Sequence, residues 1–561
     1  MHSRHVEGRL TRLISRRTFI SGTFGAVSLV HLGGCAAPAS PQTVSPTALP
    51  ATAVPVSTPP GPQAPAVAQP TRETIAVAPT PASPRRGGTL TLARQTSITD
   101  FSGVNWIAGH YAYLRSLYDT PVRVDYELKP QPVLAESWQF SPDGLMLKLN
   151  LRPGVKFHSG RELTSEDIKF SWEFGVKTSP QTTGVYAVIK DMKTPNKTTA
   201  ELYFDHPCPF VFEALDVLSI IDRDGVDKLS TQDAGSGPFT VSSYRPRSEI
   251  RMKRFGDYWQ SGKPYLDEYV IKDIPDAAAL VVNLEARAVD CIEQPPLREV
   301  ARLGALPHAV ADPGMRAPEM LNLNMNIQKG PLANKKVRQA INYVIDRERF
   351  ARTALAGTTP PTCLVWPKGS WAHFADLEDK YKLNVERAKS LMAEAGFADG
   401  FETSIVTSRA RRDVWFELAQ MAQSDLAKIG IRAKIKDVES AVYVTHWRNG
   451  DYEIITHTFG RANRDPAMTL SGATLFYPGS EAGPTKFESA DFVAWRDEAA
   501  VTLDQEKRKA LYRRIQEFFL EESFVIPIAG TDYFWVYWDY VNKMGHGLEG
   551  SPVIGNVWLS N

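Results

Sequence analysis

The composition of this 561-residue chain changes sharply near Arg86, and the change limits which part of it can fold. Residues 36–86 are rich in proline, alanine and threonine and hold almost no large apolar side chain. Such a segment cannot bury enough apolar surface to offset its loss of conformational entropy, so we expect a disordered, extended tether. The folded part is expected to begin at residue 87. Because it is too long for a single hydrophobic core, it should divide into at least two lobes.

The residues ahead of the tether have the parts of an export signal. Arg16 and Arg17 precede a weakly apolar run that ends in small residues at Cys35. The run resembles a twin-arginine (Tat) signal, and Leu32-Gly33-Gly34-Cys35 resembles the lipobox of bacterial lipoproteins, in which the cysteine takes a lipid. A transmembrane anchor is the alternative, but the run is shorter than the roughly 20 residues that span a bilayer. We expect residues 1–35 to export the chain and to leave it lipid-anchored at the extracytoplasmic face of the cell membrane or in the periplasm.

Charge and cysteine content argue against two classes of protein. The formal net charge is +1 and no long Lys/Arg run follows the tether, so a nucleic-acid partner is not expected. A local basic cluster is interpreted as a solvated face: Arg409, Arg411 and Arg412. Three further cysteines show neither a disulfide-scaffold pattern nor metal-type spacing, and one disulfide among them stays open: Cys208, Cys291 and Cys363.

The folded part mixes strand and helix patterns. Thr89–Ala93 and Leu147–Leu151 alternate between apolar and polar residues, which indicates strands. Thr164 and the acidic residues after it resemble a capping box at the start of a helix. Residues 385–395 and 505–522 carry apolar side chains at helical spacing. The sequence therefore predicts a mixed α/β fold.

Several segments, in order along the chain, resemble the family 5 solute-binding proteins, which include oligopeptide, dipeptide and nickel-chelate binders. They are Pro132–Trp138, Leu151–Gly160, Leu163–Ile168, Gly235–Phe239, Asp257–Trp259 and Val337–Arg347. The resemblance implies a two-lobed periplasmic-binding-protein fold (type II-like, class C) with a hinged ligand cleft. It implies a lobe I built from residues 87–118, 225–315 and 529–561, an inserted subdomain at 119–224, and a lobe II at 316–528, with the chain crossing between lobes near 312–322 and 525–532.

The same resemblance implies a function. The chain would be a monomeric extracytoplasmic receptor that captures a peptide-like or other small organic ligand and delivers it to the permease of an ABC importer. An oligosaccharide-binding role in the same family and a sensor or adhesion lipoprotein without a transport role are the alternatives. No enzyme, cofactor or metal site is expected, because no nucleophile with a base within reach is visible and His158 has no evident partner. The loop Gly545–Gly550 has Gly-x-Gly-x-x-Gly spacing but lacks the strand and helix context of a nucleotide site.

The resemblance also bears on the ligand. In relatives that bind peptides, an Asp four residues before a proline holds the ammonium group of the ligand, and counting back from Pro466 places Ala462 there. A methyl group cannot neutralise a buried ammonium, so a free-amino peptide is not expected unless Asp465 substitutes. A neutral or acidic molecule, such as a short glycan or a blocked peptide, is expected instead, and a metal chelate stays open.

Candidate ligand-binding residues come from three regions of the chain. The loop after the first strand should face the cleft, Trp366 follows a turn-rich segment, and donors suited to hydroxyl, carbonyl or carboxylate groups precede Pro466. Asn324 and Asn326 alternate with apolar residues, so their side chains share one face of a strand. The predicted ligand-binding residues are Asn105, Trp106, Asn324, Asn326, Trp366, Phe459, Arg461, Asn463 and Asp465.

Overall fold

The computed structural model of the chain describes most of the region that follows the predicted tether. The described residues are 83–96, 98, 102–103, 110–178, 183–229, 232–479, 483–548 and 550–560, and all of them belong to one unit, Thr80–Asn561. Arg16, Arg17, Cys35 and the tether up to residue 82 lie outside the described residues, as do Asn105 and Trp106.

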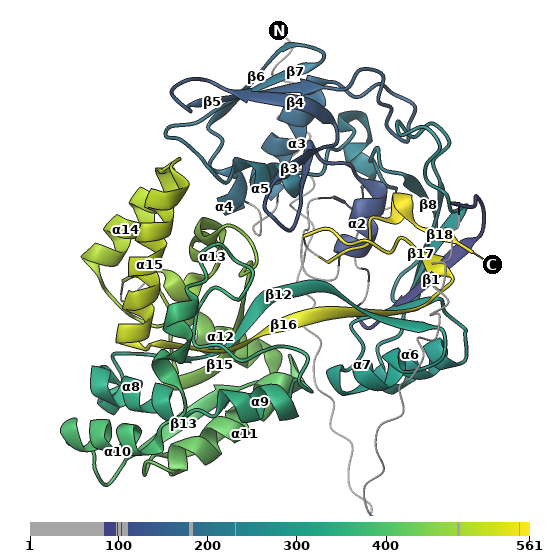
Figure 1. Cartoon of the computed structure of the whole chain (residues 1–561). Coiled ribbons are helices and arrows are strands. Elements are labelled where there is room, and N and C mark those ends of the chain that lie inside the picture. Colours follow the sequence, from purple (N-terminus) through teal and green to yellow (C-terminus); the bar gives the residue numbers. More distant parts are fainter. Residues whose placement is uncertain are drawn as a thin grey trace, which may run out of the picture. The chain divides into compact units, whose positions relative to one another are not determined.

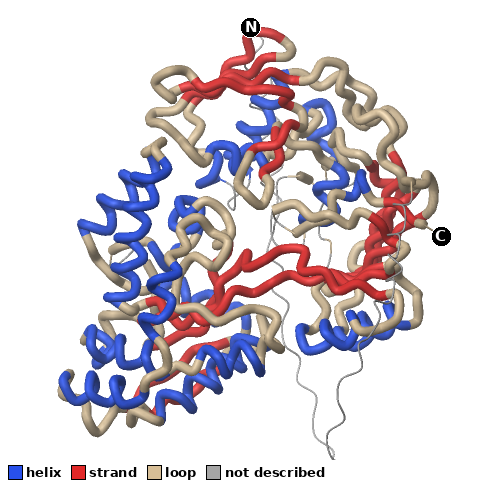
Figure 2. The backbone as a smooth tube through the Cα atoms, in the orientation of Figure 1, coloured by secondary structure: helices blue, strands red, loops and turns tan. Residues whose placement is uncertain are grey.

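A ten-stranded mixed sheet connects the two halves of this unit (Figures 1 and 2). Its central strands pair antiparallel, while β1 lies parallel to β10 and β11, and β13 lies parallel to β14 and β15. In spatial order the strands are β14 (Arg432–Asp437), β13 (Glu402–Thr407), β15 (Ile454–Gly460), β12 (Ala309–Met325), β16 (Val525–Trp538), β11 (Cys291–Glu293), β1 (Thr89–Arg94), β10 (Glu268–Asp273), β9 (Glu249–Arg254) and β8 (Phe239–Arg245).

The two long strands β12 and β16 run side by side from one half to the other (Figure 1). Their register starts with Ala309 opposite Trp538 and ends with Asn324 opposite Val525. At one end Val536 and Trp538 belong to a core with α6 (Ala277–Glu285) and α7 (Leu297–Gly304). At the other end Ile526 and Ile528 belong to a different core. A strand pair that joins two separate cores makes the fold two-lobed, with both crossings within this pair.

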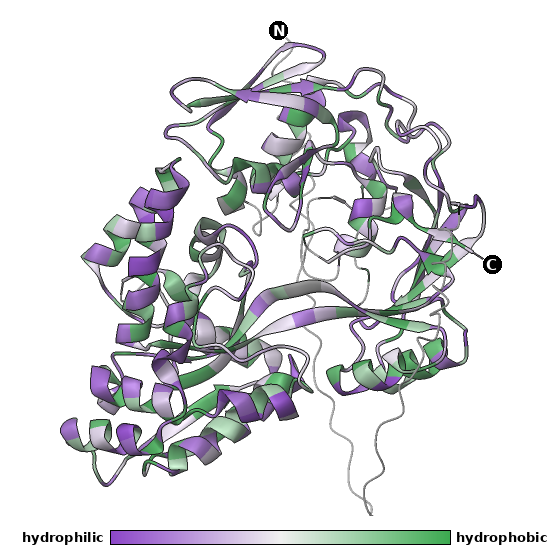
Figure 3. Ribbon diagram, in the orientation of Figure 1, coloured by the Kyte–Doolittle hydropathy of each residue, from purple (hydrophilic) through white to green (hydrophobic). Residues whose placement is uncertain are grey.

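Each lobe surrounds its part of the sheet with amphipathic helices, which carry both hydrophobic and hydrophilic residues (Figure 3). The first lobe contains α2 (Tyr111–Leu117) besides α6 and α7. The helices of the second lobe are α8 (Lys335–Val344), α9 (Arg347–Thr353), α10 (Val385–Glu394), α11 (Asp413–Ala427), α12 (Ser440–Asn449), α13 (Pro466–Gly472), α14 (Ala490–Val501) and α15 (Gln505–Glu522). Within the described part of the chain, no helix combines the length and the apolar character needed to cross a bilayer.

A second, four-stranded antiparallel sheet extends the first lobe. Its strands, in spatial order, are β4 (Ala135–Phe140), β5 (Met146–Leu151), β7 (Thr199–Tyr203) and β6 (Asp191–Asn196). The helices α3 (Ser165–Thr178), α4 (Thr183–Tyr186) and α5 (Val211–Asp216) accompany this sheet. Its core is continuous with that of the first lobe, because Leu147 and Leu202 belong to the same buried cluster as Leu90 and Leu92.

Local sequence signals placed several elements correctly. The backbone N–H of Thr164 donates to the carboxylate of Asp167 at 2.9 Å, as expected of a capping box at the start of α3. The helix predicted at 505–522 is α15, which buries Leu511, Ile515 and Phe519 as the apolar spacing indicates. The three cysteines of the described chain are buried free thiols, so no disulfide forms among them: Cys208, Cys291 and Cys363.

Two glycines allow close backbone approaches. A Cβ on Gly235 would lie 1.8 Å from the carbonyl oxygen of Leu117, which no side chain allows. A Cβ on Gly530 in β16 would lie 2.5 Å from the Cβ of Ala317, where β12 bulges and the register shifts. The bulge at the crossover therefore depends on a glycine in the opposite strand.

His158 has a structural partner that the sequence did not indicate. Its Nδ1 contacts a carboxylate oxygen of Asp233, and its Nε2 lies 2.9 Å from the carbonyl oxygen of Gly237. Both ring nitrogens therefore face oxygen acceptors, which fixes the orientation of the ring. Burial alone would raise the pKa of Asp233, but the hydrogen bond and charge of His158 hold this pKa below its usual value. The buried pair ties the segment that follows β5 to the segment that precedes β8.

We expect Asp233→Asn to lower the free energy of unfolding by about 3 kcal/mol, because it leaves a buried charge uncompensated. Because the folded-state pKa of Asp233 is lowered, its contribution is present above pH 4 and is lost as the pH falls further. Urea unfolding at pH 7 measures the change. The control is Asp257→Asn, which breaks the exposed pair of Asp257 with Lys156. An equal loss in both variants would contradict the assignment.

Candidate functional site

A cavity of about 480 Å³ lies where segments of both lobes meet. The first lobe contributes Tyr126, and the crossover strand β12 contributes Asp312, Pro313 and Gly314. The second lobe contributes the loop 367–370 and Asn463, and the C-terminal segment closes the remaining side: Met544, Gly545, His546 and Leu548. A cavity bounded by both lobes and by the strand that joins them is the expected geometry of a ligand site in a hinged protein.

The polar wall of this cavity is centred on Asp312. Its carboxylate accepts a hydrogen bond from the hydroxyl of Tyr537 at 3.2 Å and lies 3.1 Å from Nε2 of His546. The other ring nitrogen of His546 lies 3.1 Å from the carbonyl oxygen of Gly550, so these contacts fix the orientation of the ring. The wall therefore presents a carboxylate, 29% exposed, whose position is set by two buried or half-buried neighbours.

The opposite walls combine apolar surface with hydrogen-bonding groups. Tyr126 is 52% exposed, and its hydroxyl donates to the carbonyl oxygen of Gly314. Asn463 of the second lobe donates through Nδ2 to the carbonyl oxygen of Leu548 at 3.1 Å, which ties the second lobe to the C-terminal segment. Proline, methionine and leucine side chains line much of the remainder. Such a lining fits a small organic molecule with a few polar groups.

Next to Asn463, the two lobes are joined by buried ion pairs. Arg464 of the second lobe lies with Nη2 3.4 Å from Oδ2 of Asp216 and with Nη1 3.7 Å from Oε2 of Glu213, both on α5 of the first lobe. The backbone N–H of Asp465 donates to Oε1 of Glu213 at 2.9 Å. Burial, strengthened by the neighbouring charge of Asp465, raises the pKa of Glu213 to about 8. The second lobe is thus attached to the first by charged side chains and by its backbone.

The basic cluster after β13 is not simply a solvated face, which corrects the expectation from sequence. Arg412 forms a two-point ion pair with Glu319 of β12, with distances of 2.6 and 3.0 Å. The guanidinium groups of Arg409 and Arg411 lie over the rings of Phe416 and Trp415. Glu319 is 15% exposed and lies at the bulge of the crossover strand, so Arg412 connects α11 to the hinge.

Four of the predicted ligand-binding residues are buried away from the cavity. Trp366 is 0% exposed and packs against Tyr512 and Phe519 in the core of the second lobe. Phe459 packs against Phe476 in the same core. Neither ring lines the cavity in this structure, because the loop and strand that carry them turn the rings into the core. The other two are in strand β12 or at its end: Asn324 and Asn326.

Asn324 and Asn326 differ in the hydrogen bonds that their side-chain amides form. Asn326 donates to the carbonyl oxygen of Gly450 at 2.7 Å and accepts from the N–H of Gln328, so it holds a turn rather than a ligand. Asn324 is fully buried, and neither polar atom of its amide has a hydrogen-bond partner in the described structure. Asn324 lies within β12, whereas Asn326 follows the last residue of that strand.

The segment before Pro466 contains residues that stabilise the second lobe and one residue that lines the cavity. Asp465 caps α13 through the N–H of Ala467 and pairs with Arg508 at 2.7 Å, so its carboxylate is engaged within the second lobe. Ala462 is itself fully buried. Arg461 has a left-handed backbone, with φ of 65°, and its carbonyl oxygen accepts from Thr469. Asn463 is the predicted residue that lines the cavity.

Sequence reasoning missed most of the cavity wall. Tyr126 and Asp312 lie in segments without a recognisable motif, and the loop 367–370 directly follows the misassigned Trp366. Gly545 and His546 belong to the glycine-spaced loop, and this loop forms part of the wall. No signal in the sequence places these segments together, because they meet only through the tertiary fold.

An aromatic cluster in the second lobe is also engaged internally. Trp447 stacks on His457 with ring centroids 3.7 Å apart, and Trp415 donates through Nε1 to the hydroxyl of Thr458 at 2.6 Å. Burial, with Arg411 and Arg412 nearby, lowers the pKa of His457 to about 3, so its ring is neutral. Within the described chain no group of three or more histidine, cysteine, aspartate or glutamate side chains is placed to hold a metal.

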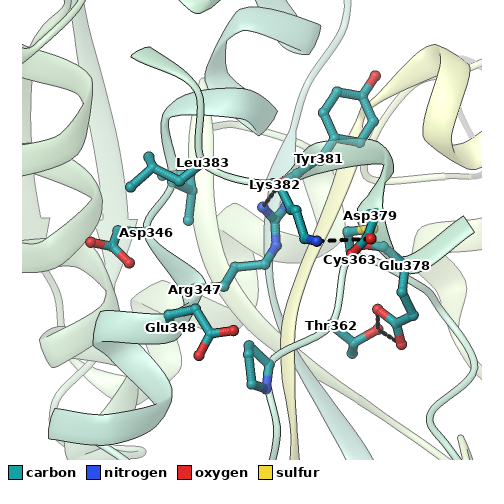
Figure 4. A pocket seen from close by; sticks show the side chains of 12 residues that line it. Asp346, Arg347, Glu348, Thr362, Cys363, Glu378, Asp379, Tyr381, Lys382 and Leu383 are labelled. Atoms are coloured by element: carbon teal, nitrogen blue, oxygen red, sulfur yellow. Dashed lines mark hydrogen bonds and ion pairs between the residues drawn. The ribbon is translucent and has the colours of Figure 1, made fainter.

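A smaller cavity of about 230 Å³ lies entirely in the second lobe (Figure 4). Its polar groups pair with one another: Thr362 donates to Glu378 at 2.9 Å, and Lys382 lies 2.8 Å from Asp379. The guanidinium of Arg347 donates to backbone carbonyl oxygens, including that of Pro527 at 2.8 Å. Because this cavity has no wall from the first lobe and its polar groups are satisfied within the protein, the cavity between the lobes is the better candidate for a ligand site.

Comparison with known proteins gives sequence relatives along most of the chain. The family model "Bacterial extracellular solute-binding proteins, family 5 Middle" matches residues 129–477. Heme-binding protein A of Haemophilus influenzae is 28% identical over 437 residues, covering 71% of this chain and 78% of the relative. The dipeptide-binding protein of Escherichia coli is 28% identical over 444 residues, covering 72% and 81%.

Solved structures agree with this assignment. The ABC transporter-associated periplasmic binding protein DppA from Helicobacter pylori, in complex with the peptide STSA, matches with a TM-score of 0.71 and 26% identity over 85% of this chain and 99% of that one. HbpA2 from Haemophilus parasuis shares the fold, with a TM-score of 0.73 and 24% identity over 84% and 100%. The family match spans more than half of the chain, and the two-lobed α/β architecture is the same. This chain therefore belongs to the bacterial extracellular solute-binding proteins of family 5.

Proposed function

We propose that the chain captures a peptide-like or other small organic molecule in the cavity between its lobes and delivers it to the permease of an ABC importer. The observation that carries the proposal is the 480 Å³ cavity, whose walls come from both lobes and from the crossover strand β12. Relatives are named for dipeptide, heme and glutathione binding, so the family accommodates chemically different ligands. Binding and release through movement of the lobes is the function that this geometry supports best.

The ligand class follows from the charges near the site. Ala462 is buried where an aspartate would be needed for an ammonium group, and Asp465 is engaged with Arg508 and the start of α13. A ligand with a free amino group would therefore have to place it elsewhere, at a cost of several kcal/mol if it stayed unpaired. We propose a neutral or acidic ligand, such as a blocked peptide. An oligosaccharide is the second candidate, although Trp366, its main predicted stacking residue, is buried.

Location and domain limits complete the proposal. The lipobox-like segment with Cys35 and the arginine pair Arg16 and Arg17 support twin-arginine export and lipid anchoring at the extracytoplasmic face. The paired crossover strands support a lobe I of residues 87–118, 225–315 and 529–561, an inserted subdomain at 119–224 and a lobe II at 316–528. We propose a monomer. A sensor or adhesion lipoprotein is distinguished from a transport receptor by whether an importer permease co-purifies with it.

Ligand class is tested by thermal melting of the purified chain with free peptides, N-acetylated peptides, oligosaccharides and metal chelates. A ligand at 100 times its Kd adds about 2.7 kcal/mol to the folded state, which raises Tm by a measurable amount. We expect N-acetylated peptides or other neutral or acidic molecules to raise Tm and free-amino peptides to leave it unchanged. A clear rise with an ordinary dipeptide would show that another carboxylate holds the ammonium group.

The cavity itself is tested with Tyr126→Ala. Truncation removes an aromatic wall that is half exposed in the free protein, so we expect affinity for the ligand found by melting to fall by on the order of tenfold. Isothermal titration calorimetry measures Kd. The control is Leu503→Ala, which truncates a 56% exposed side chain that does not line the cavity. Equal affinity of Tyr126→Ala and the unchanged chain would place the ligand elsewhere.

Anchoring is tested with Cys35→Ser in a bacterial host that processes lipoproteins. If the cysteine carries a lipid, membrane fractionation should find the unchanged chain with the membranes and the variant in the extracytoplasmic fraction, because the protein loses its anchor. Cys363→Ser, which changes a buried thiol, serves as the control. Retention of Cys35→Ser in the membrane fraction would argue against the lipid anchor.

A further inference from the structure

Arg464 is a positive side chain of the second lobe that is buried against the first lobe. It is 6% exposed and occupies the turn before α13. Its guanidinium nitrogens lie 3.4 Å from the carboxylate of Asp216 and 3.7 Å from that of Glu213. Both acids belong to α5 and are at most 4% exposed as side chains. An ion pair that joins two lobes in a buried position exists only when the lobes are together.

Charges on both sides support this contact. In the first lobe, Arg115 lies 3.0 Å from Asp216 and donates to the carbonyl oxygen of the same residue at 2.7 Å. In the second lobe, Asp465 lies 2.7 Å from Arg508. Positive and negative groups therefore alternate across the boundary. Within the first lobe Arg115 pairs with Asp216, and within the second lobe Arg508 pairs with Asp465. Such compensation is what allows charges to remain in a buried position.

Apolar contacts surround these charges. Met468 of α13 is 2% exposed and belongs to the core cluster of the first lobe, together with Tyr186 of α4. The hydroxyl of Tyr186 donates to the carbonyl oxygen of Val217 at 2.8 Å, just beyond the end of α5. The boundary between α13 and the inserted subdomain is therefore packed and excludes water around Arg464, which strengthens its electrostatic interactions.

We propose that Arg464, with Asp216 and Glu213, is a latch that defines one closed arrangement of the two lobes without a charge supplied by the ligand. The inference rests on the proposed function, since the closed arrangement also positions Asn463 at the cavity wall. Buried ion pairs add little net stability, because the charges regain water when they separate. However, any closed arrangement of the lobes that leaves one of these charges unpaired is unfavourable. The latch therefore favours the arrangement in which Asn463 donates its hydrogen bond to Leu548.

The latch has a consequence for ligand chemistry. If a ligand ammonium group formed the charged contact between the lobes, closure would require a cationic ligand. In this chain the positive group that forms this contact is the guanidinium of Arg464. Arg464 is a positioning residue, because it acts through the placement of its neighbour Asn463. Ligands without a positive group are therefore compatible with full closure, in agreement with Ala462 two positions before Arg464 in the turn.

Closure also depends on pH through Glu213. The charged and titratable groups that face it are Asp216 on its own helix and, from the second lobe, Arg461, Arg464, Asp465 and Tyr512, together with the thiol of Cys208. Burial and Asp465 raise the pKa of Glu213 to about 8 in the closed form, whereas hydration in an open form would return it to about 4.3. Closing therefore binds a proton between these values, so Glu213 faces Arg464 as a neutral group and the ion pair of the latch is that of Arg464 with Asp216. This contribution is fully present below pH 4 and is lost as pH rises through 8.

The test compares the unchanged full chain with Arg464→Met, which keeps an unbranched, flexible side chain but removes its charge. Small-angle scattering measures the radius of gyration without ligand, and hydrogen exchange measures protection of residues 211–216 and 466–472. We expect Arg464→Met to expand the protein and to lower protection in both segments by about tenfold or more, because Asp216 loses its charged partner across the boundary. The matched control is Arg513→Met, which breaks an exposed pair with Asp376 inside the second lobe.

Two further variants keep the test decisive if Arg464→Met does not fold. Arg464→Lys retains the positive charge but cannot place two nitrogens against both carboxyl groups at once. It should therefore lose less hydrogen-exchange protection than Arg464→Met. Glu213→Gln should make the scattering independent of pH between 5 and 8. Scattering and exchange equal to the unchanged chain in all three variants would overturn the latch. Because neither measurement uses a ligand, this result is independent of whether the melting panel identifies one.

Discussion

The pairing of β12 with β16 is the constraint on which the rest of the structure depends. The two paired strands hold two hydrophobic cores at a set register, while a bulge opposite Gly530 interrupts the ladder at the crossover. Backbone hydrogen bonds leave few ways for the strands to slide, but a two-stranded connection can bend and twist. The lobes are therefore free to change their separation without losing the register that brings Asp312 to the cavity wall.

Around that connection, the site is assembled from segments that are far apart in sequence. Tyr126, Asp312, Asn463 and His546 come from the inserted subdomain, the crossover, the second lobe and the C-terminal segment. Only the crossover residue is attached to both lobes. Movement of the second lobe would carry Asn463 away from Leu548 and Arg464 away from α5 in one step. Ligand contact and the charged contact between the lobes are thus coupled through neighbouring positions of one turn.

The family motifs proved to be mainly structural. Gly235 lies against the backbone of Leu117, Asp167 caps α3, and His158 pairs with Asp233. These contacts fix the inserted subdomain and its attachment, which explains why the motifs allow recognition of the fold but say little about the ligand. The cavity is lined instead by segments without a motif, in loops that the scaffold supports.

The sequence by itself determined the fold class, the strands and helices with strong periodicity, and the absence of a carboxylate at position 462. These depend on local patterns: alternation in β1, helical spacing in α15, and the identity of one residue relative to Pro466. Tertiary structure alone decided which side chains face the cavity. Trp366 and Phe459 turned into the core because aromatic rings gain most from burial, and no local pattern distinguishes a ring that packs from one that binds. The partners of Arg464 and His158 likewise lie far along the chain, and only folding brings them within contact distance.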